Sequence, residues 1–300
     1  MKKVGNFFFI FVPLLLVTGI QYISLFFSMG ISALLEFSRY IYFDTTDIFD
    51  IISDLGYYWA TQRFNTYLMV VYSVITIAVF GIWYYMKYDG NYLPAPRTVF
   101  HPVSILGIVM LVPGTQLLSS YIIAFTASLF PSWLERYEDL LETAGLDERI
   151  TFGLFLYSVL LAPICEELVF RGVTMRQAKK VLPFWGANLM QAFLFGVFHG
   201  NMMQGIYAFC LGILLGYVCE RSGSIYNSIL LHMLFNFWGT VISEYLNYGD
   251  TLFSFLFWLV FGIGITTAGI AVFFLGTNKC REWAQANSRR SIPDNPGEIG

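Results

Sequence analysis

The chain has 300 residues, of which 57% are hydrophobic, 19% aromatic and only 12% charged, and its formal net charge is -3. A soluble domain carries about 25% charged residues, so this composition excludes a soluble globule and a disordered chain. Because there is no basic excess, it also excludes a nucleic-acid-binding protein. The composition therefore predicts an all-α polytopic membrane protein surrounded by the lipid bilayer.

Eight apolar segments follow one another along the chain, and each is a candidate span because about 20 mostly apolar residues cross a bilayer. They lie near residues 7–27, 67–86, 102–127, 151–165, 183–198, 203–219, 224–243 and 252–275. The pattern predicts one membrane-embedded bundle over residues 1–278 with about eight transmembrane helices, of which the fourth, fifth and sixth are short. Residues 279–300 are polar and contain two prolines, which predicts a disordered cytoplasmic tail.

The Lys and Arg residues indicate which ends of the spans face the cytoplasm. With the N-terminus inside, the outer segments hold only four of the 17 basic residues: Arg39, Arg63, Arg136 and Arg149. Cytoplasmic loops carry the excess of Lys and Arg, so we expect both termini in the cytoplasm. The outer loops are acidic over residues 44–54 and 135–148, and we expect these acids to form solvated faces.

Few ionisable side chains lie in or beside the predicted spans, where charge is costly and usually functional. The short set comprises Glu166, Glu167, Arg171, His199 and His232. Glu167 and Arg171 are four residues apart, so on a helix the spacing predicts an ion pair. Glu166 lies about 100° further round the helix, outside that pair. The simpler interpretation is that all three are ordinary end-of-helix charges at the cytoplasmic interface.

Both of these histidines lie on helix faces that carry a second polar side chain. Gln191, Phe195 and His199 recur at every fourth residue, and so do His232 and Asn236, so each set shares one face of its helix. A single histidine on an apolar helix is more often structural than catalytic. Polar pairs on three short spans, two of them with a histidine, together favour a common functional site.

These residues form three motifs that resemble those of the CPBP family, which includes CAAX prenyl endopeptidases, bacteriocin-processing enzymes and related membrane proteins. In chain order the motifs are Glu166-Glu167-x-x-x-Arg171 (EExxxR), Phe195-x-x-x-His199 (FxxxH) and His232-x-x-x-Asn236 (HxxxN). The resemblance covers about residues 150–240 and places the motif-bearing core in the fourth to seventh helices. The presence of all three motifs in order makes the resemblance specific.

The resemblance implies an intramembrane endopeptidase that hydrolyses a peptide bond. Glu166 with His199 would activate a water, and His232 and Asn236 would stabilise the oxyanion that forms when the carbonyl is attacked. The remaining motif residues would support the site: Glu167, Arg171 and Phe195. We expect a peptide or protein substrate, which can itself be associated with the membrane. The distribution of the family indicates that the protein lies in a bacterial cell membrane.

A metal site is an alternative for the chemistry, because two histidines and a glutamate can form a three-ligand catalytic zinc site. Asn236 suits an oxyanion donor better than a zinc ligand, so we favour metal-free glutamate chemistry without a cofactor. The sequence contains neither HExxH nor GxSxG, the signatures of zinc proteases and of α/β-hydrolases. A function of a different class is a non-proteolytic immunity or regulatory scaffold protein of the same family that binds another membrane protein. The intact motif set favours the enzyme.

The predicted spans raise one difficulty. Glu166 would lie roughly 22 Å from a span start at residue 151, near the inner side, and His199 roughly 24 Å from an inner start at residue 183, near the outer side. Straight spans would keep the two side chains apart. We therefore expect the turn at residues 199–201 to lie within membrane depth and to line a wet cavity, as irregular backbone there must.

Overall fold

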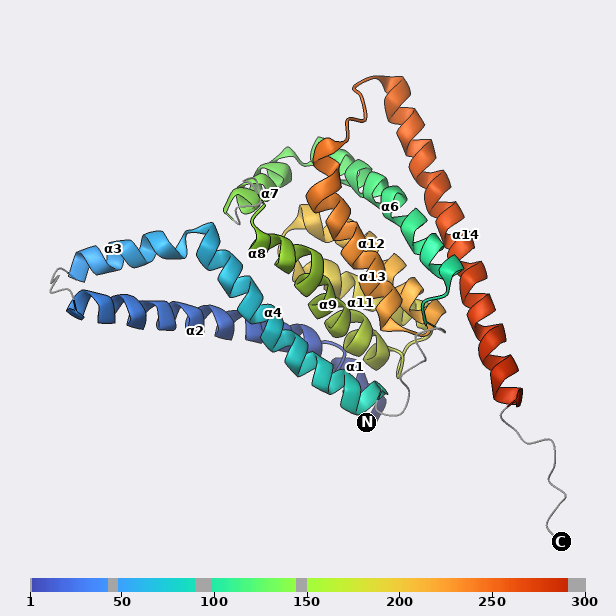
Figure 1. Ribbon diagram of the computed structural model, residues 1–300, viewed down its shortest axis with the longest axis horizontal. Coiled ribbons are helices and arrows are strands. Elements are labelled where there is room, and N and C mark those ends of the chain that lie inside the picture. Colours follow the sequence, from blue (N-terminus) through green and yellow to red (C-terminus); the bar gives the residue numbers. More distant parts are fainter. Residues whose placement is uncertain (1, 43–47, 90–98, 144–149, 291–300) are drawn as a thin grey trace, which may run out of the picture. The chain divides into compact units, whose positions relative to one another are not determined.

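The computed structural model describes residues 2–42, 48–89, 99–143 and 150–290, and every regular element within them is a helix (Figure 1). Seven helices are long and apolar enough to cross a membrane, which confirms an all-α polytopic membrane protein. They are Val4–Ser38, Gln62–Lys87, Pro102–Leu129, Phe152–Ala178, Met202–Ser222, Ile225–Ile242 and Leu252–Cys280. The fifth of the eight expected spans is a shorter apolar helix of 15 residues, α11 (Phe184–Phe198).

The helices form two compact units, and each is described by itself. The first unit consists of Met1–Asp89 and Ile122–Gly216, and the second of Gly90–Tyr121 and Tyr217–Gly300. Two helices, α6 (Pro102–Leu129) and α12 (Met202–Ser222), contribute residues to both units. That residues 1–278 act as one domain stays a prediction.

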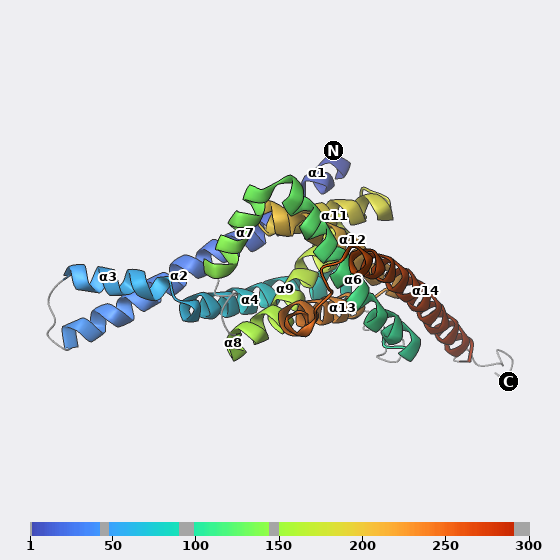
Figure 2. The same cartoon turned by 90° about the horizontal axis from the view of Figure 1, so that it is seen from above.

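The first unit begins with four helices. They are α1 (Lys2–Phe8), α2 (Val12–Tyr42), α3 (Ile48–Trp59) and α4 (Gln62–Tyr84), which continues as a π-helical turn over Tyr85–Asp89. Of these, α1, α2 and α4 contact the helix that carries the first motif. α2 and α3 run side by side (Figures 1 and 2). Trp59 Nε1 donates a hydrogen bond of 2.8 Å to Ser32 Oγ between them. α4 begins after Thr61, whose hydroxyl accepts from the Phe64 N–H and so caps the helix.

One continuous helix, Phe152–Ala178, carries the first motif. Its parts are α8 (Phe152–Phe155), the π-helical η2 (Leu156–Leu161), α9 (Ala162–Glu167), the π-helical η3 (Leu168–Thr174) and α10 (Met175–Ala178). The expected end of this span at residue 165 is wrong, because the helix continues through Glu166, Glu167 and Arg171 to Ala178 and no proline follows before Pro183. Glu166 therefore lies near the middle of the helix, about 20 Å from either end. π-Helical turns inside α-helices are frequent at functional sites.

The two acidic segments that the sequence predicts to be outer loops are helical where the structure describes them. They form α3 and α7 (Pro131–Thr143). Helices form here because apolar side chains recur on one side, and in α3 Ile51 and Leu55 are buried. The acidic side chains of both helices are exposed, which confirms the solvated faces: Asp50, Asp54, Glu135, Glu138, Asp139 and Glu142. Residues 43–47 and 144–149 lie outside the described residues.

The second unit contains the first part of α6, the end of α12, α13 (Ile225–Phe237) and α14 (Leu252–Arg290), with short helical turns over residues 238–245. Glycines let α6 and α14 pack closely, since a Cβ at Gly107 would overlap the Phe273 backbone and one at Gly276 would overlap Ser104. α14 continues to Arg290, so half of the tail expected to be disordered is helical. Its residues are mostly good helix formers and the prolines follow later. Residues 291–300 lie outside the described part of the chain.

Candidate active site

Glu167 and Arg171 form an ion pair that is shielded from solvent. Arg171 Nη1 lies 2.8 Å from Glu167 Oε1, and both side chains have an exposed fraction of 0%. The spacing of four residues predicted this pair, and the structure confirms it. Complete burial rules out the interpretation of these two residues as interfacial charges. Because either charge alone would be costly to bury, the pair fixes which side of the helix faces inward.

Arg171 also joins the first motif to two other helices of the first unit. Its Nη2 donates to the Gly212 carbonyl oxygen of α12 over 3.3 Å. Its guanidinium carbon lies 4.4 Å from the centroid of the Phe195 ring of α11, which is a cation–π contact. The first two motifs are therefore in direct contact through Arg171 and Phe195.

His199 ends α11 and is followed by a tight turn. The φ angle of Gly200 is 71°, in the left-handed region that favours glycine. His199 Nδ1 lies 2.8 Å from the Phe195 carbonyl oxygen, which can only accept, so Nδ1 carries the proton. In the neutral imidazole Nε2 is then the acceptor. The ring also lies edge-on to Phe195, with ring centroids 4.8 Å apart, so Phe195 holds its histidine by two contacts.

The helix of the first motif and α11 form a hairpin whose register brings Glu166 and His199 to the same level. The Phe170 ring lies 5.1 Å from the Phe195 ring and 5.5 Å from the Phe198 ring. Glu166 is one turn before Phe170 and His199 is one turn after Phe195, so in antiparallel helices they lie on facing turns. The fourth span continues to Ala178 instead of ending near Glu166, so the span lengths no longer require the two side chains to lie at opposite ends of their helices.

Glu166 is half-buried, in contrast to its neighbour Glu167. It lies close enough to Tyr157 of the same helix and to Tyr207 of α12 for its charge to act on both side chains. The sequence gives no reason to select these tyrosines, because neither belongs to a motif with Glu166.

His232 and Asn236 belong to the second unit, where α13 carries both one turn apart. His232 is buried, with an exposed fraction of 3%, and Asn236 is half-buried. Two long-range hydrogen bonds hold this helix. Gln116 Nε2 donates to the Phe235 carbonyl over 2.6 Å, and Asn227 Nδ2 donates to a carbonyl ahead of α6, that of residue 99, over 3.0 Å. The third motif is therefore presented on one face of an anchored helix.

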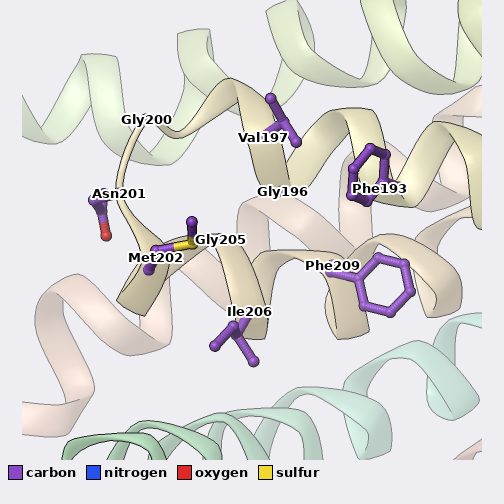
Figure 3. A pocket seen from close by; sticks show the side chains of 9 residues that line it. All are labelled: Phe193, Gly196, Val197, Gly200, Asn201, Met202, Gly205, Ile206 and Phe209. Carbon is purple, nitrogen blue, oxygen red and sulfur yellow. The ribbon is translucent and has the colours of Figure 1, made fainter. Parts of the chain in front are cut away.

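An apolar cavity of about 400 Å³ lies beside the turn between α11 and α12 (Figure 3). Its lining residues are Phe193, Gly196, Val197, Gly200, Asn201, Met202, Gly205, Ile206 and Phe209. Phe193 and Val197 lie on the side of α11 opposite to Phe195, and His199 does not line the cavity. This cavity is apolar, and no motif residue lines it. The wet cavity expected at this turn stays a prediction.

A metal site needs several ligand side chains close together, and each unit can be searched for such a group. Among the residues that the structure describes there, no three His, Cys, Asp or Glu side chains are grouped so that they could hold a metal ion. In the first unit, Glu166 and His199 are the pair that the motifs supply. The third ligand of the zinc alternative, His232, belongs to the second unit, so the zinc site stays a prediction.

These features define a polytopic membrane protein with a carboxylate and an imidazole on facing turns among its apolar helices. The family model described as type II CAAX prenyl endopeptidase Rce1-like matches residues 148–238, which include all three motifs. The match covers less than a third of the chain, and it confirms the resemblance seen in the motifs. At the level of the family it supports an intramembrane protease. No curated protein and no solved structure matches the chain significantly.

Proposed function

We propose that this protein is an intramembrane endopeptidase in which Glu166 and His199 activate a water molecule for attack on a peptide bond. The Glu166 carboxylate accepts a proton from the water while the water oxygen bonds to the carbonyl carbon. His232 and Asn236 donate hydrogen bonds to the oxyanion that forms. The C–N bond then breaks, and the proton passes from Glu166 to the leaving amine.

His199 has a defined part in this proposal. With its Nδ1–H bonded to the Phe195 carbonyl, Nε2 of the neutral ring is an acceptor and orients the water toward the scissile carbonyl. Glu166 takes the proton, so the two groups do not compete for the same role. The chemistry proposed is metal-free, and zinc is the alternative that a chelator separates from it.

The register between the first-motif helix and α11 is the observation that carries the proposal. The contact between Phe170 and Phe195 supports a register in which Glu166 and His199 lie on facing turns of one hairpin. General bases and the groups that share their water must lie within hydrogen-bond reach of one another or of one bridging water. Two motifs separated by about thirty residues thus meet through the packing of two adjacent helices.

A peptidase assay with the full-length protein in detergent tests the proposal. The substrates are fluorogenic peptides, each prepared with and without a C-terminal prenyl group. We expect the wild type to cleave at least one of them, and Glu166→Gln and His199→Ala to lower kcat by about 10²- to 10⁴-fold. Glu36→Gln is the matched control, because Glu36 is another half-buried glutamate in a span of the first unit.

Equal cleavage by the wild type and both motif variants would contradict the proposed chemistry. The non-proteolytic alternative makes a different prediction for the same proteins. An immunity or scaffold protein would cleave no peptide, and it would bind its membrane partner equally well with Glu166 or with glutamine at that position.

A further inference from the structure

Two side-chain amides outside the catalytic proposal are completely buried in α11. Asn188 and Gln191 have exposed fractions of 0%, although polar groups are costly in an apolar helix unless they are hydrogen-bonded. Gln191 Nε2 donates to Asn188 Oδ1 over 2.7 Å and to the Gly212 carbonyl over 2.9 Å. Asn188 Nδ2 donates to the Ile213 carbonyl over 3.0 Å. The two amides therefore bind backbone carbonyls in the middle of α12.

Glycines in α12 make these bonds possible. Gly212 and Gly216 are four residues apart and so face α11 together. A Cβ at Gly216 would overlap Asn188 Oδ1, and a Cβ at Gly212 would lie 3.1 Å from Phe195 Cδ1. Small residues spaced in this way let membrane helices approach closely, and polar side chains then hydrogen-bond across them. Here the approach is close enough for side-chain amides to reach main-chain oxygens.

Gln191 and Arg171 share one acceptor. Both donate to the Gly212 carbonyl, from Nε2 over 2.9 Å and from Nη2 over 3.3 Å. Among the described residues no donor reaches Gln191 Oε1, so its two donor bonds alone hold this side chain. Gln191 thus ties α11 to the same point of α12 that Arg171 uses, and Arg171 in turn lies against Phe195.

Phe195 connects this network to His199. Its carbonyl accepts the Nδ1–H bond and its ring packs edge-on against the imidazole. The Phe195 carbonyl and His199 both lie at the last turn of α11. Without the bonds to α12 this end of the helix is held less firmly, so the turn that carries the carbonyl and the imidazole can fray. We propose that Gln191, with Asn188, is a positioning residue that fixes the orientation and the tautomer of His199. Its consequence for catalysis rests on the proposed function, whereas its effect on the imidazole does not.

Histidine NMR of the full-length protein tests the proposal directly. The chain has only three histidines, and with ¹⁵N,¹³C-labelled histidine the His199 signal is assigned by its loss in His199→Ala. At a pH where the ring is neutral, we expect the wild type to show the Nδ1–H tautomer. Gln191→Met, which keeps the length of the side chain and removes its donors, should shift the ring toward the Nε2–H tautomer. Asn188→Ala should change the tautomer in the same direction.

Leu189→Met is the matched control, because Leu189 is exposed on the same helix; it should leave the tautomer unchanged. In the peptidase assay we expect Gln191→Met to lower kcat by about 10- to 100-fold, as the loss of supporting residues typically does, with KM within about twofold of the wild-type value.

An unchanged tautomer in Gln191→Met would overturn the proposal. So would loss of the folded protein in both Gln191→Met and Asn188→Ala with Leu189→Met intact, since the network would then be purely structural. A tautomer shift in a protein that cleaves no peptide would support the positioning role and contradict the proposed function instead.

Discussion

Glu166 and Glu167 are adjacent in the sequence but lie in different surroundings. Glu167 is fully buried and bonded to Arg171, whereas Glu166 is half-buried on the turn that faces His199. The helix rotates by about 100° between them, so one glutamate enters the packed interior and its neighbour does not. Under the proposed function, Glu167 contributes to stability and Glu166 to the chemistry.

The first prediction separates these two roles by the same substitution at neighbouring positions. Glu167→Gln leaves the buried Arg171 cation without its carboxylate, and we expect the free energy of unfolding to fall by about 3–5 kcal/mol. Glu166→Gln should change it by less than about 1 kcal/mol while lowering kcat by about 10²- to 10⁴-fold. Denaturant titration of both variants in the same detergent measures the difference. Equal losses of stability would show that the ion pair does not distinguish the two glutamates.

Much of the candidate site could be predicted from spacing within single helices. The Glu167–Arg171 pair and the shared face of His232 and Asn236 both follow from a repeat of about four residues, which depends only on local helix geometry. The same reasoning underlies the three motifs. These features are local, so one sequence contains the information for them.

The length of the fourth span could not be predicted in the same way. Glu166, Glu167 and Arg171 interrupt the apolar run, and hydropathy alone then ends the span at residue 165. In the folded chain Glu167 and Arg171 neutralise each other inside the protein, so the helix continues to Ala178. The contact of Gln191 with Gly212 likewise depends on how closely two helices approach, which no spacing within one helix reveals.

The second prediction concerns that close approach. Gly216→Ala adds a Cβ that would overlap Asn188 Oδ1, so the amide must move from its bond to the Ile213 carbonyl. We expect a loss of about 1–3 kcal/mol in the free energy of unfolding, as for other overpacked sites. Gly19→Ala in α2 is the control, because its Cβ would meet nothing within 4 Å and alanine favours the helix by about 0.5–1 kcal/mol. If both variants are equally stable, the α11–α12 contact is looser than the structure shows.

The third prediction concerns the oxyanion donors. Asn236→Ala should lower kcat by about 10²- to 10³-fold, which is the usual cost of removing one donor to a developing oxyanion. KM should change little, because the donor acts mainly on the transition state. Asn247→Ala, at an exposed position after α13, should retain wild-type kinetics. A rise in KM with unchanged kcat would assign Asn236 to substrate binding instead.

The fourth prediction separates metal-free chemistry from zinc chemistry. The bond from His199 Nδ1–H to the Phe195 carbonyl fits both, because histidines that bind metals also donate their second ring N–H to a carbonyl or carboxylate. The amide of Asn236 fits an oxyanion donor better than a metal ligand. We therefore expect full peptidase activity after dialysis against a zinc chelator, measured on a peptide that the untreated protein cleaves. The dialysed Glu166→Gln variant should stay inactive when zinc is added. Complete loss of wild-type activity that zinc alone restores would instead make Glu166 and His199 metal ligands.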